Sequence, residues 1–210
     1  MHTPLHYQNK NLEEVKEFLK QNAFGILVNQ TEGRPCATHI PLELDVDADG
    51  HDILLGHVSK ANPQWKYFKE NKQILAIFNG PHSYISSSWY QEEEVPTWNY
   101  IAVHIYGTIE ILDEKTLLES LHTLVDKYEK GSADPVSLHN LSDRTMKQIN
   151  GIVGFKIRIS EIQATYKLSQ TRPKDHPKII EELKKTNNGA SHEIADIMQN
   201  YKGKCPNNQP

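Results

Sequence analysis

Ser59, Lys60 and Asn62 form a short polar stretch that follows a run of β-forming residues and precedes Pro63. The pair Asn62-Pro63 predicts a helix that is capped by Asn62 and begins at Pro63. The first N–H groups of a helix have no partner inside it and carry the positive end of its dipole, so they attract anions. With a hydroxyl and an ammonium just upstream, this stretch could hold a phosphate group. On spacing alone, an ordinary strand-to-helix turn with an exposed lysine is the commoner explanation, because the P-loop pattern is missing.

A second candidate binding segment, residues 82–100, is rich in hydroxyl, amide and aromatic side chains. Its rings could shelter a planar ligand while its hydroxyls and amide satisfy the polar edge of that ligand. Aromatic packing at a subunit interface explains the same rings equally well, and the two interpretations are compatible. The residues concerned are Tyr84, Trp89, Tyr90, Trp98, Tyr100, Ser86, Ser88 and Asn99.

The composition of the 210-residue chain is that of a globular protein, with 37% apolar residues and a formal net charge of −4. A negative net charge argues against a surface coated with basic residues for nucleic acid. The N-terminus lacks the apolar core of a signal peptide and no apolar run approaches membrane-spanning length, so we expect a cytoplasmic protein. Cys36 and Cys205 lie far apart and the eleven histidines are scattered, so we expect neither a disulfide nor a metal site.

Hydrophobic periodicity and turn residues predict about six strands interspersed with helices, without regular βαβ alternation. The predicted strands cover 24–29, 36–44, 53–58, 73–78, 101–112 and 151–159, with an added edge strand at 164–170. The predicted helices cover 11–21, the residues after Pro63, 115–130, 142–148, 178–185 and 191–201. Gly80-Pro81 predicts a loop, and the polar segment 45–50 predicts a hairpin turn, since the glutamate of a calcium loop is missing. The pattern indicates a small antiparallel barrel with peripheral helices.

Four strings of this sequence resemble successive motifs of the PaiB family, which are FMN-binding negative transcriptional regulators. The strings are GHVSKANPQW, GPHSYISSSWY, VPTWNYIAVHIYG and IVGFKIRISEIQATYKLSQTR, at 56–65, 80–90, 95–107 and 152–172. The resemblance covers nearly the whole chain. It implies an α+β, mainly β fold, the antiparallel FMN-binding split β-barrel shared with pyridoxamine-phosphate-oxidase-like proteins, usually a homodimer with flavin at the interface. We expect residues 1–170 to form the barrel domain and 171–210 a C-terminal helical extension packed on it, loose from about residue 203.

The resemblance also implies which residues lie near FMN, the expected cofactor, and it assigns no catalytic residue and no metal ligand. The implied FMN-binding residues are His57, Ser59, Lys60, Asn62, Ser86, Ser88, Trp89, Asn99, Lys167, Ser169 and Gln170. Two positions depart from the family pattern. Ser87 replaces the proline of a YISPSWY motif, and Thr171 replaces the asparagine of KLSQNR. Losing the proline frees φ at Ser87, which predicts a more mobile loop there.

Three classes of function follow from these observations. The family implies a flavin-binding regulator, but the sequence contains no clear helix-turn-helix, and its basic excess at 167–185 is modest, so the charge distribution does not support direct DNA binding. An FMN-dependent flavin reductase or oxidase is the first alternative, because the same barrel supports redox chemistry. A haem-binding or haem-degrading split barrel is the second, encouraged by the histidine count but not by an assignable axial ligand. Fold analogy alone does not decide among them.

Overall fold

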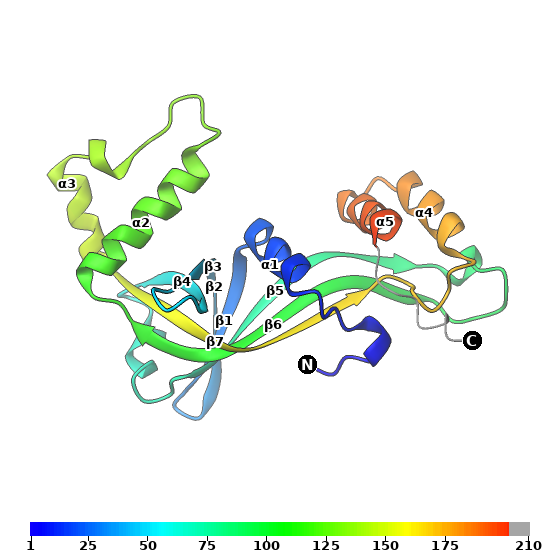
Figure 1. Ribbon diagram of the computed structural model, residues 1–210, viewed down its shortest axis with the longest axis horizontal. Helices are drawn as coiled ribbons and strands as arrows, with labels where there is room; N and C mark the ends of the chain where they lie inside the picture. The colour runs from blue at the N-terminus through cyan, green and yellow to red at the C-terminus, as the bar shows by residue number, and fades with distance from the viewer. Residues whose placement is uncertain (202–210) are drawn as a thin grey trace. The chain divides into compact units, whose positions relative to one another are not determined.

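The computed structural model of the chain describes residues 1–201, and its centre is a sheet of seven strands in the order β2-β1-β5-β6-β7-β4-β3 (Figure 1). The pairs β1–β2, β1–β5, β3–β4 and β4–β7 are antiparallel, as the sequence predicted. The strands are β1 Phe24–Thr31, β2 Arg34–Pro41, β3 Glu43–Val46, β4 Asp52–Ser59, β5 Gln73–Ile85, β6 Thr97–Ile111 and β7 Ile152–Lys167. The expected loose end from about residue 203 lies outside the described residues.

Helices precede, interrupt and follow these strands. The α-helices are α1 Leu12–Gln21, α2 Glu114–Glu129, α3 Asp143–Met146, α4 His176–Lys185 and α5 Gly189–Asn200. The 3₁₀ helices are η1 Leu5–Tyr7, η2 Pro63–Tyr67, η3 Ser87–Trp89, η4 Leu138–Asn140 and η5 Lys147–Gly151. None of the helices within residues 1–201 has the length and apolar character needed to cross a bilayer.

The chain divides into two compact units, which we describe separately. The first unit consists of residues 1–18, 78–104 and the chain from Gln163 onward, and the second unit consists of residues 19–77 and 105–162. The long strands β5, β6 and β7 each contribute residues to both units. The expected boundary at residue 170 between a barrel domain and a helical extension stays a prediction.

The second unit contains two hairpins and the helix α2. β1 and β2 are joined by Glu32 and Gly33, which both have positive φ. β3 and β4 are joined by a turn in which Oδ1 of Asp47 accepts the N–H groups of Asp49 and His51 at 3.0 and 2.8 Å. The expected hairpin turn at this acidic segment is therefore confirmed. The side chains that form the core of the unit include Leu27, Leu54, Phe68, Ile105, Leu117, Leu121, Phe155 and Ile157.

The first unit contains the far ends of β5, β6 and β7 together with α4 and α5. The helices α4 and α5 lie side by side and bury Ile179 and Leu183 from one helix and Ile194 and Met198 from the other (Figure 1). A buried hydrogen bond of 2.9 Å between the hydroxyls of Ser83 and Ser191 connects β5 to α5. At the other edge of the unit, the N-terminal segment pairs with β7 through an isolated antiparallel bridge between Gln8 and Thr165.

Four local predictions of secondary structure are wrong. The segment 36–44 is two strands, because the chain leaves β2 after Pro41 and the N–H of Leu42 donates to the carbonyl of Ala23. The two strands expected at 151–159 and 164–170 are one continuous strand, β7, of which residues 152–158 pair with β4. The helix expected after Pro63 is the single 3₁₀ turn η2.

The loop expected at Gly80-Pro81 is also absent, because β5 continues through both residues to Ile85. The pairing of β1 with β5 ends at Ile77, and β1 itself begins at Phe24, so Pro81 lies beyond the end of β1. A strand tolerates proline where no neighbour needs its N–H.

A Cβ on Gly80 would lie 2.7 Å from Cε2 of Phe18. Glycine at this position therefore permits the close approach of α1.

Candidate functional site

His57, Ser59, Lys60 and Asn62, the first group of expected FMN-binding residues, follow one another at the end of β4 in the second unit. The expected cap is confirmed, because Oδ1 of Asn62 accepts the N–H of Gln64 at 3.0 Å and Pro63 is the first residue of η2. The helix that follows has only five residues, so its dipole is small.

The backbone N–H groups of this stretch are engaged within the protein. The N–H of Lys60 donates to the carbonyl of Gly151 at 2.8 Å, and that of Asn62 donates to the carbonyl of Ser59 at 2.9 Å. The N–H of Ala61 donates to Oγ of Ser59 at 3.2 Å. With the N–H of Gln64 taken by its cap, residues 60–64 leave no main-chain donor for a phosphate. Any anion contact here must therefore come from side chains, of which those of Ser59 and Lys60 are exposed.

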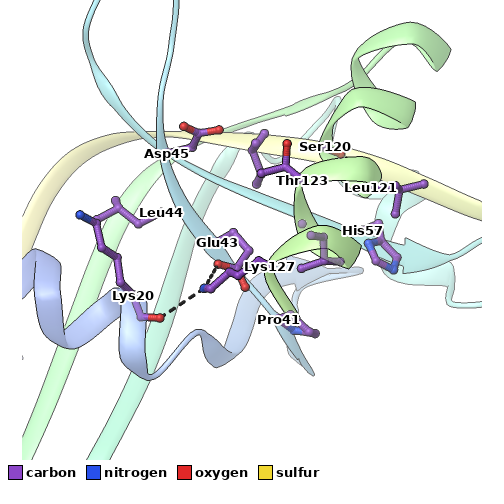
Figure 2. A pocket seen from close by; sticks show the side chains of 13 residues that line it. Lys20, Pro41, Glu43, Leu44, Asp45, His57, Ser120, Leu121, Thr123 and Lys127 are labelled. Carbon is purple, nitrogen blue, oxygen red and sulfur yellow. Dashed lines mark hydrogen bonds and ion pairs between the residues drawn. The ribbon is translucent and has the colours of Figure 1, made fainter. Parts of the chain in front are cut away.

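His57 and Lys60 lie at different cavities. His57 is half-buried and lines a cavity of about 280 Å³ between β3, β4 and α2 (Figure 2). Burial in this cavity lowers the pKa of His57, because the charged imidazolium is poorly solvated there. Lys60 instead lines a second cavity of about 280 Å³, with residues from α2 and the segment 146–152.

The His57 cavity has an apolar lining and one charged edge. Lys127 of α2 pairs with Glu43 of β3 at 2.5 Å, and its ammonium also donates to the carbonyl of Lys20 at 3.3 Å (Figure 2). The apolar lining residues are Pro41, Leu44, Leu55, Leu121 and Leu124. Sequence reasoning did not identify this cavity, because its lining residues come from four segments that are brought together only by the fold.

Asn99, Ser169 and Gln170, from the second group of expected residues, are buried in the first unit and bond within the protein. Nδ2 of Asn99 donates to Oγ of Ser169 at 2.9 Å, and Oγ of Ser169 donates to Oδ1 of Asn99 at 3.1 Å. Oε1 of Gln170 accepts the N–H of Leu168 at 2.8 Å, and its Nε2 donates to the carbonyl of Tyr166. These side chains therefore stabilise the turn after β7, in which Ser169 has a φ of 59°.

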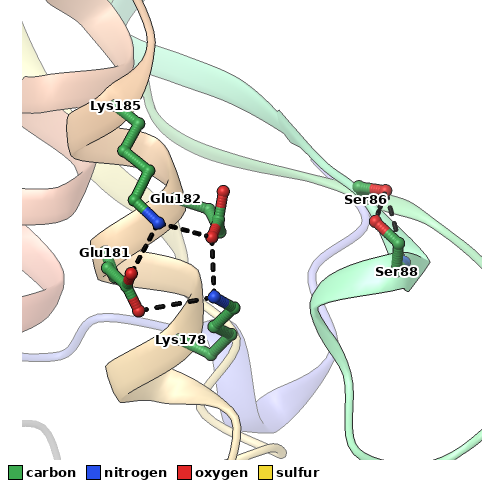
Figure 3. Close-up of polar contacts among 6 residues, drawn as sticks. All are labelled: Ser86, Ser88, Lys178, Glu181, Glu182 and Lys185. Atoms are coloured by element: carbon green, nitrogen blue, oxygen red, sulfur yellow. Dashed lines mark hydrogen bonds and ion pairs between the residues drawn. The ribbon is translucent and has the colours of Figure 1, made fainter.

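Ser88 and Trp89 belong to η3, the short 3₁₀ turn after β5, and Ser86 is its N-cap residue. The hydroxyls of Ser86 and Ser88 are hydrogen-bonded to each other at 2.8 Å, and Oγ of Ser86 caps η3 by accepting the N–H of Ser88 (Figure 3). The structure brings these two serines together, whereas their expected contacts with FMN stay predictions.

Lys167, the last of the expected residues, lines a polar cavity of about 160 Å³ in the first unit. Its ammonium donates to Oγ1 of Thr97 and lies 5.6 Å from the centre of the Tyr7 ring. Burial lowers the pKa of Lys167. Sequence reasoning missed Tyr7, Thr97 and Arg172 in the lining of this cavity, although Arg172 ends the KLSQTR motif and could have been found from it.

Two rings of the aromatic segment are exposed on neighbouring strands of the first unit. Tyr84 on β5 is 48% exposed and Trp98 on β6 is 51% exposed, and their ring centres lie 6.3 Å apart. The ring of His82 lies 5.3 Å from that of Trp98. Large aromatic side chains at this level of exposure are typical of surfaces that bind a ligand or another chain.

Comparisons with known proteins identify the family to which this chain belongs. The model of the family described as "Putative FMN-binding domain" matches residues 1–161. The chain is 42% identical over 201 residues to "Protease synthase and sporulation protein PAI 2" of Bacillus subtilis (strain 168), covering 95% of this chain and 97% of the relative.

Two solved structures share the fold at low sequence identity. The FAD and heme binding protein from Mycobacterium smegmatis has a TM-score of 0.60 and 16% identity, covering 77% of this chain and 73% of the other. The flavocytochrome Anf3 from Azotobacter vinelandii has a TM-score of 0.62 and 18% identity, covering 79% of this chain and 72% of the other. At these identities the likeness concerns the fold alone.

Proposed function

The chain belongs to the FMN-binding domain family that matches residues 1–161, and we propose that it is a flavin-binding regulatory protein that acts as a homodimer in the cytoplasm. The family match confirms the expected cofactor, FMN, and the 42% identity to the Bacillus subtilis protein confirms the resemblance to the PaiB family. The predicted split-barrel fold is confirmed as well. The regulatory role, the homodimer and the location are proposals that rest on the family and on the surfaces described above.

The residues of the chain fit a flavin in two respects. The exposed rings of Tyr84 and Trp98 offer apolar surface for a planar ring system, and the polar cavity at Lys167 offers a positive charge. When bound, FMN would supply hydride or electron transfer, whereas the protein would supply binding, orientation and electrostatics. We propose that the eleven residues implied by the family resemblance contribute to FMN binding, with Lys60 as a contact of the phosphate.

The observation that carries the homodimer is the exposed aromatic pair Tyr84 and Trp98 on adjacent strands. Aromatic residues are enriched in the buried centres of protein interfaces, where each removes a large apolar area from water. A second copy of the chain that covers these rings would bury them and could shelter a flavin beside them.

Direct DNA binding is the weaker part of the regulatory proposal. The basic excess at 167–185 is largely paired with acidic side chains of the same unit. Lys178 lies 2.7 Å from Glu182, and Lys185 lies 2.5 Å from Glu181 on the exposed face of α4 (Figure 3). Phosphate contacts need unpaired lysine or arginine side chains. We therefore expect any direct DNA binding to be weak and to lack sequence preference.

A flavin reductase or oxidase activity remains the second candidate, and the His57 cavity favours it. A half-buried imidazole with a lowered pKa beside an apolar cavity of about 280 Å³ is an arrangement that can hold a small organic substrate. Turnover of NADH or NADPH by the FMN-loaded protein would support this candidate over a regulator that only binds flavin.

The absorption spectrum of the freshly purified protein tests the proposal. We expect the spectrum of bound FMN, and we expect added FMN to bind when the protein is purified without it. A haem spectrum would favour the haem-binding alternative. A colourless protein that does not bind added FMN would contradict the proposed function.

A further inference from the structure

Gln64 of η2 is the centre of a buried hydrogen-bond network in the second unit. Its side chain is 0% exposed, and its Nε2 donates to the carbonyls of Leu27 and Cys36 at 3.2 and 3.3 Å and to Oδ1 of Asn29 at 3.0 Å. Main-chain carbonyls can only accept, so they fix which end of the Gln64 amide faces them. Oε1 of Gln64 therefore faces the hydroxyl of Thr38, which donates to it at 2.5 Å.

The orientation of Gln64 determines that of Asn62 through Thr38. A hydroxyl has one proton, and Thr38 gives it to Gln64, so the hydroxyl oxygen can only accept from Asn62. Nδ2 of Asn62 donates to that oxygen at 2.9 Å, which leaves Oδ1 to accept the N–H of Gln64 at 3.0 Å. Both ends of the Asn62 amide are engaged within the protein. The cap of η2 therefore depends on a threonine 24 residues away in the sequence.

The main chain of Lys60 is held at both of its polar groups. Its N–H donates to the carbonyl of Gly151 at 2.8 Å, and its carbonyl accepts the indole N–H of Trp65 at 3.0 Å. Trp65 follows Gln64 in η2, so the cap formed by Asn62 also fixes the turn that carries the indole. The side chain of Lys60 is exposed. An exposed ammonium on a fixed main chain costs less to order when it contacts a ligand.

We propose that Thr38 and Gln64 are positioning residues for FMN, which hold the main chain at Lys60 so that its ammonium can contact the phosphate. Neither is among the residues implied by the family resemblance, and Asn62, which is, contributes by position instead of by contact. The inference rests on the proposed function, because it takes Lys60 as the contact of the phosphate. Removing one hydroxyl from β2 should then impair phosphate recognition, although that hydroxyl bonds to Gln64 and Asn62.

Thr38→Val tests the inference, because valine resembles threonine in shape and lacks its hydroxyl. We expect it to weaken FMN binding about three- to tenfold and riboflavin binding less than about twofold, in titrations that follow flavin fluorescence. Thr38→Ser, which keeps the hydroxyl, should restore most of the preference for FMN. The matched control is Thr108→Val, at a half-buried threonine of β6 in the second unit, which should leave that preference unchanged.

A double variant shows whether Thr38 acts through Lys60. Adding Thr38→Val to Lys60→Ala should leave the remaining preference for FMN unchanged, because no ammonium is left to position. Additive effects of the two substitutions would overturn the inference, because Thr38 would then act on the phosphate by another route. A loss that FMN and riboflavin share equally would overturn it as well.

Hydrogen exchange of the full-length, flavin-free protein provides a readout that does not need FMN. Thr38→Val should speed the exchange of the N–H groups of Gln64 and Lys60 about threefold or more, because the cap and the turn after it lose their support. Thr108→Val should not. Exchange in Thr38→Val that matches the control would overturn the inference.

Circular dichroism identifies a variant that fails to fold. Asn62→Ser, which keeps an oxygen for the cap and loses the donor to Thr38, then carries the test, with the same expected changes in exchange and in FMN preference. A protein that binds no FMN would refute the proposed function, and the exchange rates would then decide separately whether Thr38 holds the main chain at Lys60.

Discussion

The side chains of Asn99 and Ser169 exchange two hydrogen bonds, at 2.9 and 3.1 Å, across 70 residues of sequence. Both residues are buried, so each satisfies polar atoms that would otherwise lack a partner. Their bonds connect the start of β6 to the turn after β7, the turn that also positions Lys167 and Arg172 at their pocket. Two residues assigned to FMN by family resemblance therefore have a structural role that is visible without the cofactor.

We expect Asn99→Ala and Ser169→Ala each to lower the free energy of unfolding by about 1–3 kcal/mol, because each leaves a buried polar partner unpaired. The double variant should lose less than the sum, with a coupling of about 0.5–3 kcal/mol. Urea unfolding of the unmodified protein, the two single variants and the double variant completes this double-mutant cycle. The control is Ser160→Ala, because Ser160 is an exposed serine of β7. Strict additivity would show that the two side chains do not stabilise each other.

Glycine-to-alanine substitutions in the second unit should lower stability by amounts that depend on which atoms the new Cβ contacts. At Gly107 the Cβ would clash with the backbone carbonyl of Arg158, and at Gly154 it would lie 2.5 Å from Cδ1 of Leu117. Because a leucine side chain can shift, Gly154→Ala should lower the free energy of unfolding by about 1–3 kcal/mol. Gly107→Ala should lower it more, because a backbone carbonyl cannot shift as easily. Gly151→Ala, where nothing lies within 4 Å, is the control. Equal urea midpoints for all three variants would contradict these close approaches.

The stability of the protein should fall in mild acid partly because of His57. Burial lowers its pKa below 6.5, the value expected in the unfolded chain, so the unfolded chain binds more protons between these two pKa values. Stability is therefore lost as the pH falls through 6.5 toward the lowered pKa, by at most about 1.4 kcal/mol per pH unit.

His57→Gln should flatten this pH dependence, because it removes the buried imidazole. Burial also lowers the pKa of His104, so part of the loss of stability in mild acid should remain in the His57 variant. Urea unfolding about one pH unit above and below 6.5 measures how stability depends on pH in the unmodified protein and in the variant. A slope unchanged in His57→Gln would show that this imidazole is not held neutral by burial.

Lys60→Ala should weaken FMN binding more than riboflavin binding, because riboflavin lacks the phosphate that we propose Lys60 contacts. The loss should be about tenfold or more, as expected for one charge-assisted hydrogen bond of roughly 1.5–3 kcal/mol. Lys66→Ala, an exposed lysine of η2, is the matched control. Equal losses for the two flavins would remove Lys60 from the phosphate site and favour Lys167 in its place.

The periodicity of the sequence was sufficient to predict most elements. The apolar stripe of 115–130 predicted the helix α2, whose Leu117 and Leu121 are buried as expected. Pro81 misled the prediction, because local turn signals do not reveal that β1 ends before this proline. Whether a proline interrupts a strand depends on which neighbour needs its N–H, and that depends on tertiary structure.

The candidate site was predictable only in part. The cap formed by Asn62 follows from a local pattern, and the structure contains it. The internal bonding of the N–H of Lys60 was not predictable, because its acceptor, the carbonyl of Gly151, lies 91 residues away in the sequence. The polar cavity at Lys167 likewise combines Tyr7, Tyr90 and Arg172, which no local motif contains together.

The central claim is that this chain binds FMN as a homodimer, and native mass spectrometry of the FMN-loaded protein tests it most directly. We predict a complex of two chains with up to two FMN molecules, and we predict that Trp98→Ala, which removes an exposed ring, lowers the fraction of dimer. A stable monomer that binds FMN with full affinity would contradict the shared dimer, and a protein that retains no FMN at saturating concentration would contradict the central claim itself.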